Sequence, residues 1–156
     1  MPQSNQPATL DIPITDQPGH LIRRAHQISV SVFLETMGRE VTPVQYAVLR
    51  VLQDNPGIDQ VTLAQQVALD TSTTADIAAR LDAKGWIARK VLARGRRELN
   101  LTQEGKMLLG SMVPAMAKMQ DTLLGTLSDQ ERRDFMALLR KFVDTNNERS
   151  RAPLRT

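Results

Sequence analysis

The chain has 156 residues, of which 41% are hydrophobic and 24% charged, a composition typical of one globular domain rather than of a disordered segment. It contains no cysteine, which excludes disulfides, cysteine-based zinc sites and thiol switches. The formal net charge of +3 is too small to identify a polyanionic partner by itself. Aromatic residues make up only 3%, so we expect an aliphatic and methionine-containing core, which favours packed helices over a sheet-rich fold.

Several classes of protein are disfavoured by what the sequence lacks. No segment approaches the roughly 20 apolar residues that cross a bilayer. The first 16 residues do not show the basic and then apolar pattern of a secretory signal. We therefore expect a soluble, cytoplasmic protein with no membrane contact. The two histidines, His20 and His26, cannot form a structural metal site without carboxylate ligands, so we expect neither a metal nor a cofactor.

The first elements follow from prolines and from helical periodicity. Residues 1–17 carry three prolines among polar residues and are predicted to form a disordered arm. From residue 20 to residue 36, apolar side chains recur at steps of four, three and four, which predicts an amphipathic helix. Gly38 is expected to end it.

The middle of the chain predicts a helix-turn-helix. Thr42 is a suitable N-cap before a proline and opens a helix that an Asn-Pro-Gly sequence ends. A short helix over residues 60–67 follows, with Asp59 as its cap. Residues 70–74 (DTSTT) are a run of capping residues that opens another helix, which reaches Lys84.

The last third of the chain predicts a hairpin and two long helices. Residues 86–91 and 99–101 are strand-like and flank a basic, glycine-containing turn, which indicates a two-stranded hairpin. Thr102 is expected to cap a helix in which Pro114 causes a kink. Ser128 and Glu131 have capping-box spacing and start the final helix, which extends through Val143.

These elements give a fold that is mainly α with a small β-hairpin wing. We expect a single domain over residues 18–145, with a winged helix-turn-helix at about 42–102 and a basic, flexible tail at 146–156. The outer helices, at about 19–37 and 102–145, have apolar stripes too long for so small a domain to cover. A methionine-rich stripe suits a packed core and a dimer interface better than a metal or ligand surface. We therefore expect these helices to form a homodimer, whose two-fold symmetry suits a palindrome with half-sites about one turn apart.

An ordered set of short motifs resembles the MarR family of bacterial regulators over most of the chain. The motifs are residues 42–49 (TPVQYAVL), residues 63–64 (LA), residues 69–87, which end in RLDAKGWI, and residues 101–105 (LTQEG). The resemblance implies a homodimeric repressor that binds a palindromic operator in double-stranded DNA and is released by a small ligand. The wing departs from the family pattern, because Gly95, Arg96 and Arg97 stand where the family usually has Asp-Arg-Arg. The acid that commonly holds the wing arginine is therefore missing.

The helix that begins near residue 71 is the expected recognition helix. A helix fits the major groove, where side chains near its N-terminus reach base edges and its free N–H groups favour phosphate. The candidates are Thr71, Ser72, Thr73 and Asp76. We expect one of these four to cap the helix and at least one to contact a base. A carboxylate near DNA needs a cation, and Arg80, four residues after Asp76, is expected to pair with it.

The hairpin is the second predicted DNA contact. It holds five cations against the single acid Glu98, and these are Arg89, Lys90, Arg94, Arg96 and Arg97. So basic a turn can place one arginine in the minor groove and others on phosphates. The alternative is a solvated charged face.

The start of the first helix carries an unbalanced group of cations. His20, Arg23 and Arg24 share the face opposite the apolar stripe with no acid before Glu35, and His26 lies at the edge of the stripe. The stretch GHLIRRAH looks like a subgroup of the family that responds to hydroxylated aromatic or nicotinate-type carboxylates. The resemblance thus implies a small aromatic carboxylate effector, hydroxynicotinate-like, at these four residues. The alternative is a solvated basic face.

Other function classes fit less well. The sequence has no glycine-rich phosphate loop, no cysteine nucleophile and no Ser-x-x-Lys motif, so we do not expect an enzyme. A protein–protein interaction module would require an apolar exposed face on the recognition helix, where the sequence supplies polar residues. A ligand-insensitive DNA binder remains an alternative that the sequence does not separate from a ligand sensor.

Overall fold

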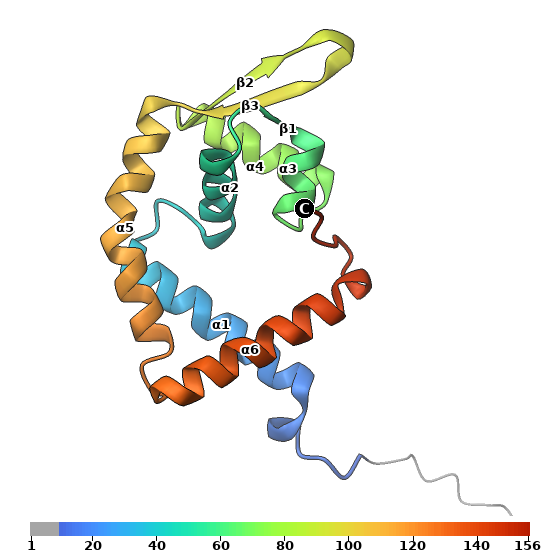
Figure 1. Cartoon of the computed structure of the whole chain (residues 1–156), viewed down its shortest axis with the longest axis vertical. Coiled ribbons are helices and arrows are strands. Elements are labelled where there is room, and N and C mark those ends of the chain that lie inside the picture. The colour runs from blue at the N-terminus through green and yellow to red at the C-terminus, as the bar shows by residue number, and fades with distance from the viewer. Residues whose placement is uncertain (1–9) are drawn as a thin grey trace, which may run out of the picture.

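The computed structural model describes residues 10–156 and contains helices together with one small antiparallel sheet that lies at one end of the molecule (Figure 1). The helices are α1 (Pro18–Met37), α2 (Pro43–Asp54), α3 (Gln60–Gln66), α4 (Thr71–Ala83), α5 (Gln103–Leu123) and α6 (Asp129–Thr145). The strands are β1 (Ile58–Asp59), β2 (Ile87–Val91) and β3 (Arg97–Leu101). The predicted fold class, mainly α with a hairpin wing, is confirmed.

Helix starts follow the capping residues of the sequence. Thr42 forms a capping box with Gln45, in which each side chain bonds the other residue's backbone N–H. Ser128 and Glu131 form the predicted box at the start of α6. Asp59 and Thr102 cap α3 and α5 as predicted. Because the free N–H groups of each first turn are bonded, the helices begin where their caps stand.

The core lies between the helix-turn-helix and the sheet. Its fully buried members come from α2, α3, α4, β2 and β3, and they include Leu49, Leu63, Leu81, Ile87 and Leu99. The same cluster continues along α5 through buried methionines to Phe33 of α1. Helix α4 and the hairpin of β2 and β3 therefore share one packed core, which fixes the position of each relative to the other.

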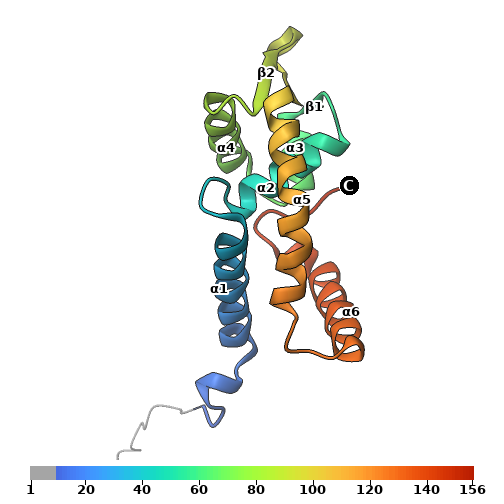
Figure 2. The ribbon, with the colours of Figure 1, turned by 90° about the vertical axis from the view of Figure 1, so that its left-hand side faces the viewer.

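The elements fall into two groups in space. Helices α2, α3 and α4 lie with the sheet at one end, and the hairpin of β2 and β3 projects away from them (Figure 1). Helices α1, α5 and α6 make up the other end, where α5 connects the two groups (Figure 2). Within the described residues, none of the helices combines the length and apolar composition needed to cross a bilayer.

Three details differ from the sequence-based expectations. The sheet has three strands in the order β1-β3-β2, because residues 58–59 pair with β3 beside the hairpin. Part of the predicted disordered arm, Ile14–Asp16, is a short 3-10 helix, while residues 1–9 of that arm lie outside the described residues. The tail after α6 is not a free end, because it forms the 3-10 helix Asn147–Arg149 and bonds back to α3. Pro114 lies inside α5 as predicted, and the kink expected there stays a prediction.

Candidate nucleic-acid interface

Helix α4 begins at an aspartate that organises its first turn. Asp70 Oδ1 accepts hydrogen bonds from the backbone N–H of Thr73 (2.8 Å) and the hydroxyl of Ser72 (2.7 Å), and Oδ2 accepts one from the Thr73 hydroxyl (2.8 Å). These bonds, the backbone one first, hold the pKa of Asp70 well below its usual range. A negative charge therefore persists at the start of the helix at neutral pH.

The expectation that one of Thr71, Ser72, Thr73 and Asp76 caps this helix is wrong. Asp70 is the N-cap, because its side chain is the one placed to reach the N–H three residues ahead. The hydroxyls of Ser72 and Thr73 donate to that cap, and Thr73 is half-buried. Thr71 is exposed and its hydroxyl has no protein partner within the described residues. It is therefore the hydroxyl in this turn that is most available to an incoming base or phosphate.

The predicted pair between Asp76 and Arg80 does not form. Both side chains are exposed, and none of the ion pairs in the described part of the chain joins them. Exposed pairs of this kind gain little energy, since water competes for both charges. Both side chains are consequently free to face a partner on the outer surface of α4.

The wing is a regular hairpin with an arginine-rich tip. Strands β2 and β3 pair from Ile87 opposite Leu101 to Val91 opposite Arg97. The tip is closed by the Leu92 N–H, which donates to the Arg96 carbonyl (2.7 Å). Arg94 and Gly95 lie in the left-handed region, with φ of 61° and 73°. This conformation turns the chain in a few residues and leaves the tip side chains of Arg94, Arg96 and Arg97 exposed.

One of the predicted DNA-contacting arginines has a structural partner instead. Arg89 Nε lies 3.0 Å from Asp82 Oδ2, and the two side chains are 27% and 37% exposed. This pair joins β2 to the last turn of α4. Since partial burial strengthens such a charged hydrogen bond, it fixes the wing relative to the recognition helix.

A second acid, Asp59, lies near the tip of the wing. Asp59, the cap of α3, has a lowered pKa, mainly because of hydrogen bonds from the hydroxyl and the backbone N–H of Thr62, and Arg96 contributes to the same shift. The start of α3 and the wing tip enclose a shallow cavity of about 280 Å³. Asp82 of α4 therefore pairs with an arginine of the wing, and Asp59 at the start of α3 lies near the wing tip.

The predicted ligand cluster lies on the exposed N-terminal half of α1. Arg23 Nη1 donates to Gln27 Oε1 (3.1 Å), and Arg23 Nη2 lies 3.4 Å from His20 Nδ1. Arg24 and His26 are exposed, and no ion pair within the described residues involves any of these side chains. His20, Arg23 and Gln27 thus lie together, whereas His26 lies about 60° around the helix from Arg23 and about 100–120° from Gln27 and His20. The described residues contain no cluster of histidine and acidic side chains suited to a metal.

Comparison with known proteins shows which family this chain resembles. The family model described as "MarR family" matches residues 41–99, which span α2 to β3. The transcriptional repressor NicR of Pseudomonas putida is 30% identical over 136 residues, which are 85% of this chain and 86% of NicR. The chain belongs to the MarR family. It is a transcriptional regulator with a winged helix-turn-helix, and its relatives are regulators and not enzymes.

Two solved structures of MarR-like regulators share the whole fold. The PcaV regulator of Streptomyces coelicolor, in complex with its natural ligand, superposes with a TM-score of 0.81 at 33% identity, covering 87% of this chain and 98% of PcaV. Bordetella bronchiseptica BpsR, whose DNA binding is regulated by 6-hydroxynicotinic acid, gives 0.80 at 31% identity, covering 86% of this chain and 99% of BpsR.

The sequence alone did not identify the partners of the candidate DNA-binding cations. The capping role of Asp59 was predicted, but its proximity to Arg96 was not, because 37 residues separate them in the sequence. The pairing of Asp82 with Arg89 could have been predicted from the sequence. Both residues flank the tight turn between α4 and β2, and a helix end followed by a strand brings such positions together.

Proposed function

We propose that this protein is a homodimeric repressor that binds a palindromic operator and is released by a small aromatic carboxylate. One observation carries the DNA-binding part. The exposed arginines of the wing tip, Arg94, Arg96 and Arg97, stand on the same packed unit as the polar first turn of α4. A helix for the major groove and a cationic hairpin beside it are the two contacts that a winged helix makes with duplex DNA.

The surface of α4 supports DNA over a protein partner. Among its residues the large apolar side chains are buried or half-buried, and those of Thr71, Ser72, Asp76 and Arg80 are exposed. A protein-binding helix would instead present an apolar patch, since such patches supply most of the energy of protein association.

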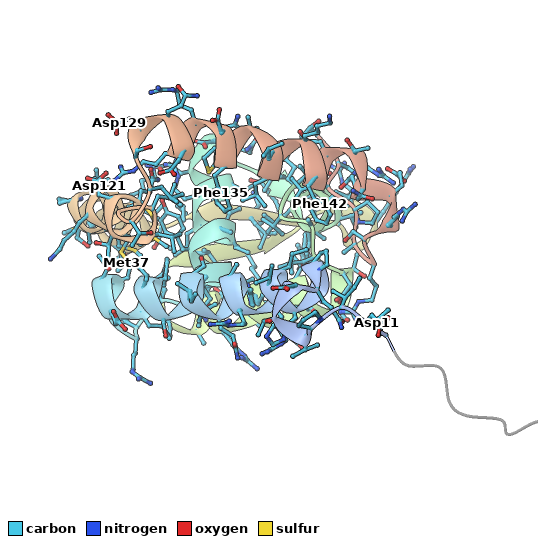
Figure 3. All side chains as sticks on the ribbon, turned by 90° about the horizontal axis from the view of Figure 1, so that it is seen from below. Asp11, Met37, Asp121, Asp129, Phe135 and Phe142 are labelled. Carbon is cyan, nitrogen blue, oxygen red and sulfur yellow. The ribbon has the colours of Figure 1, made fainter. Side chains whose placement is uncertain are left out.

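Unpartnered apolar faces support the dimer. Helix α6 buries none of its residues within the chain, yet Phe135, Leu138 and Phe142 are apolar and exposed. Phe135 and Phe142 project from α6 toward the space that separates it from α1 (Figure 3). Leu21 and Ile28 of α1 are exposed as well. A second copy that covers both helices would remove this surface from water and would place two recognition helices about 34 Å apart, on successive turns of one face of the DNA.

The cations of α1 support a carboxylate effector. Arg24 has no acidic partner in the described residues, and Arg23 is already oriented by Gln27 and His20. Guanidinium groups bind carboxylates through paired N–H donors, so the exposed cations of α1 suit an effector that carries a carboxylate. The similarity to BpsR, whose DNA binding is regulated by 6-hydroxynicotinic acid, supports an effector such as 6-hydroxynicotinate, and PcaV is a further similar regulator that binds a ligand.

Fluorescence anisotropy tests the DNA-binding part. The protein is titrated into labelled duplex from the region upstream of its own gene and into a scrambled duplex, at several salt concentrations. We expect a preference of at least about 10³ for the upstream duplex, and a log–log salt slope near −0.9 per neutralised phosphate. Equal, weak binding to both duplexes would contradict the proposal, provided that the upstream region is tiled completely.

The effector is tested on the preformed complex. Addition of 6-hydroxynicotinate is expected to lower the anisotropy, whereas the matching neutral amide should have no effect, because the cation cluster recognises the charge. Release by both compounds would contradict recognition of the carboxylate. Sedimentation at several protein concentrations checks the dimer independently, and a monomer at micromolar concentration would contradict it.

A further inference from the structure

The recognition helix carries an unfavourable charge for a surface that meets DNA. From Asp70 to Ala83 the chain contains three carboxylates, Asp70, Asp76 and Asp82, and one cation, Arg80. Duplex DNA presents about one negative charge per 1.7 Å of its axis, so each unpaired carboxylate that approaches it weakens binding. The cations that compensate this helix have to come from other elements.

Two such cations contact opposite ends of α4. Arg89 of the wing binds Asp82 in the last turn, as described above. Arg151 of the C-terminal tail lies at the first turn, with its Nη2 3.6 Å from Asp70 Oδ2. The Arg151 side chain is 92% exposed, so the pair adds little to folding stability, and its role has to be sought elsewhere.

The tail is held in place by contacts that do not involve Arg151. The Arg155 N–H donates to the carbonyl of Gln65 in α3 (3.0 Å), so the end of the chain lies beside α3 (Figure 1). The Asn147 side chain accepts from the Leu154 N–H (2.8 Å) and donates to the Leu154 carbonyl (3.0 Å). An ion pair between Arg155 and Glu148 closes the same loop. Arg151 stands in the middle of this closed loop and is thereby positioned at Asp70.

We propose that the C-terminal tail, residues 147–155, is a working part of the DNA-binding surface, in which Arg151 neutralises Asp70 at the start of the recognition helix. The inference rests on the proposed function. Asp70 cannot lose its charge by protonation near neutral pH, because the bonds that make it the helix cap also keep it ionised. A fixed cation beside it leaves the cap intact and removes the repulsion between the cap and the phosphates.

A double-mutant cycle with a matched control tests the pair. The proteins are wild type, Arg151→Ala, Asp70→Asn and the double variant, with Arg149→Ala as control, since Arg149 lies in the same tail, is exposed and has no ion pair within the described residues. Asparagine is as good an N-cap as aspartate, so Asp70→Asn removes the charge and keeps the helix start. The readout is operator affinity between 50 and 200 mM salt.

We expect Arg151→Ala to weaken operator binding about tenfold at 50 mM salt, and less at 200 mM, where screening is stronger. The double variant should bind within about twofold of wild type, and Arg149→Ala should lose less than about threefold. Thermal stability should not change in any of the arginine variants. Equal losses for Arg149→Ala and Arg151→Ala, or a loss that persists in the double variant, would overturn the pairing.

DNA binding by wild type and by Arg151→Ala separates this inference from the proposed function, and hydrogen exchange tests the position of the tail. If wild type binds no duplex, the proposed function fails, whereas normal operator binding by Arg151→Ala removes only the role of the tail. The placement of the tail is tested without DNA by Asn147→Ala, which removes both bonds to Leu154. We expect faster amide exchange over residues 65–74 in this variant. Unchanged exchange would mean that the tail does not hold this turn.

Discussion

The close contact between α5 and the start of β2 requires glycine at position 105, because any side chain there would clash with the backbone of Trp86. A Cβ placed on Gly105 would lie 2.0 Å from the carbonyl oxygen of Trp86 and 3.3 Å from Leu101 Cδ2. That carbonyl accepts the N–H of Thr102, the cap of α5, at 3.1 Å. Because real Cβ contacts are essentially never shorter than 3.0 Å, Gly105→Ala would displace the helix from the start of β2 by at least 1 Å.

The expected cost follows from three contributions. Overpacking against backbone costs up to about 3 kcal/mol, and loss of the hydrogen bond between Thr102 and Trp86 costs about 1 kcal/mol. Alanine regains about 1 kcal/mol of helix propensity over glycine. The net destabilisation of about 3 kcal/mol corresponds to a fall in Tm of about 6–12 °C for a chain of this size.

Thermal unfolding followed by circular dichroism at a fixed protein concentration measures this effect, since a dimer's Tm depends on concentration. Gly110→Ala is the matched control, because it lies in the same helix and an added Cβ there meets no atom within 4 Å. We expect it to raise the Tm by about 2 °C through helix propensity alone. A Gly105→Ala variant as stable as wild type would refute the close approach of α5 to β2.

Four further outcomes are expected. Arg97→Ala should weaken operator and scrambled duplex alike and reduce the salt slope by about 0.9, as removal of one phosphate contact requires; an unchanged slope would remove the wing tip from the interface. Thr71→Ala should lower operator affinity without affecting the scrambled duplex, and equal losses on both would argue against base recognition. Arg24→Ala should raise the concentration of 6-hydroxynicotinate needed for release while operator affinity is kept, and a titration that matches wild type would rule out this residue. Asp59→Ala should cost about 1 kcal/mol of stability at pH 7 through the lost cap. The folded-state pKa of Asp59 is lowered, so its contribution to the free energy of unfolding is present above the unfolded pKa of about 3.9 and is lost as the pH falls through the folded pKa. Urea unfolding at pH 7 and pH 3 should show that the stability difference between wild type and variant shrinks at pH 3. An equal difference at both pH values would contradict the assignment.

The helices and the wing were predictable because their signals are local. Periodic apolar side chains and the caps at Thr42, Thr102 and Ser128 set the helix starts, and the structure begins its helices there. It was harder to predict which of residues 70–74 is the N-cap of α4. Each residue in this run can cap a helix, and only the geometry of the turn selects Asp70.

The charge partners of the site were not predictable in the same way. The pair of Arg151 with Asp70 joins residues 81 positions apart, and the tail that carries Arg151 has the polar, basic composition of a flexible end. Its order comes from Asn147 and Leu154, whose two hydrogen bonds leave no periodic or compositional signal. The third strand was missed for a related reason, since two residues are too few to show alternation.

Hydroxyl-radical footprinting on the DNA upstream of the protein's own gene tests the central claim most directly. A symmetric dimer that inserts α4 into successive major grooves predicts two protected regions about one helical turn apart, related by a dyad, with flanking protection from the wings. Their disappearance on addition of 6-hydroxynicotinate would support release by the effector. A single, asymmetric footprint would contradict the account. So would the absence of a footprint at a protein concentration at which the dimer is fully formed.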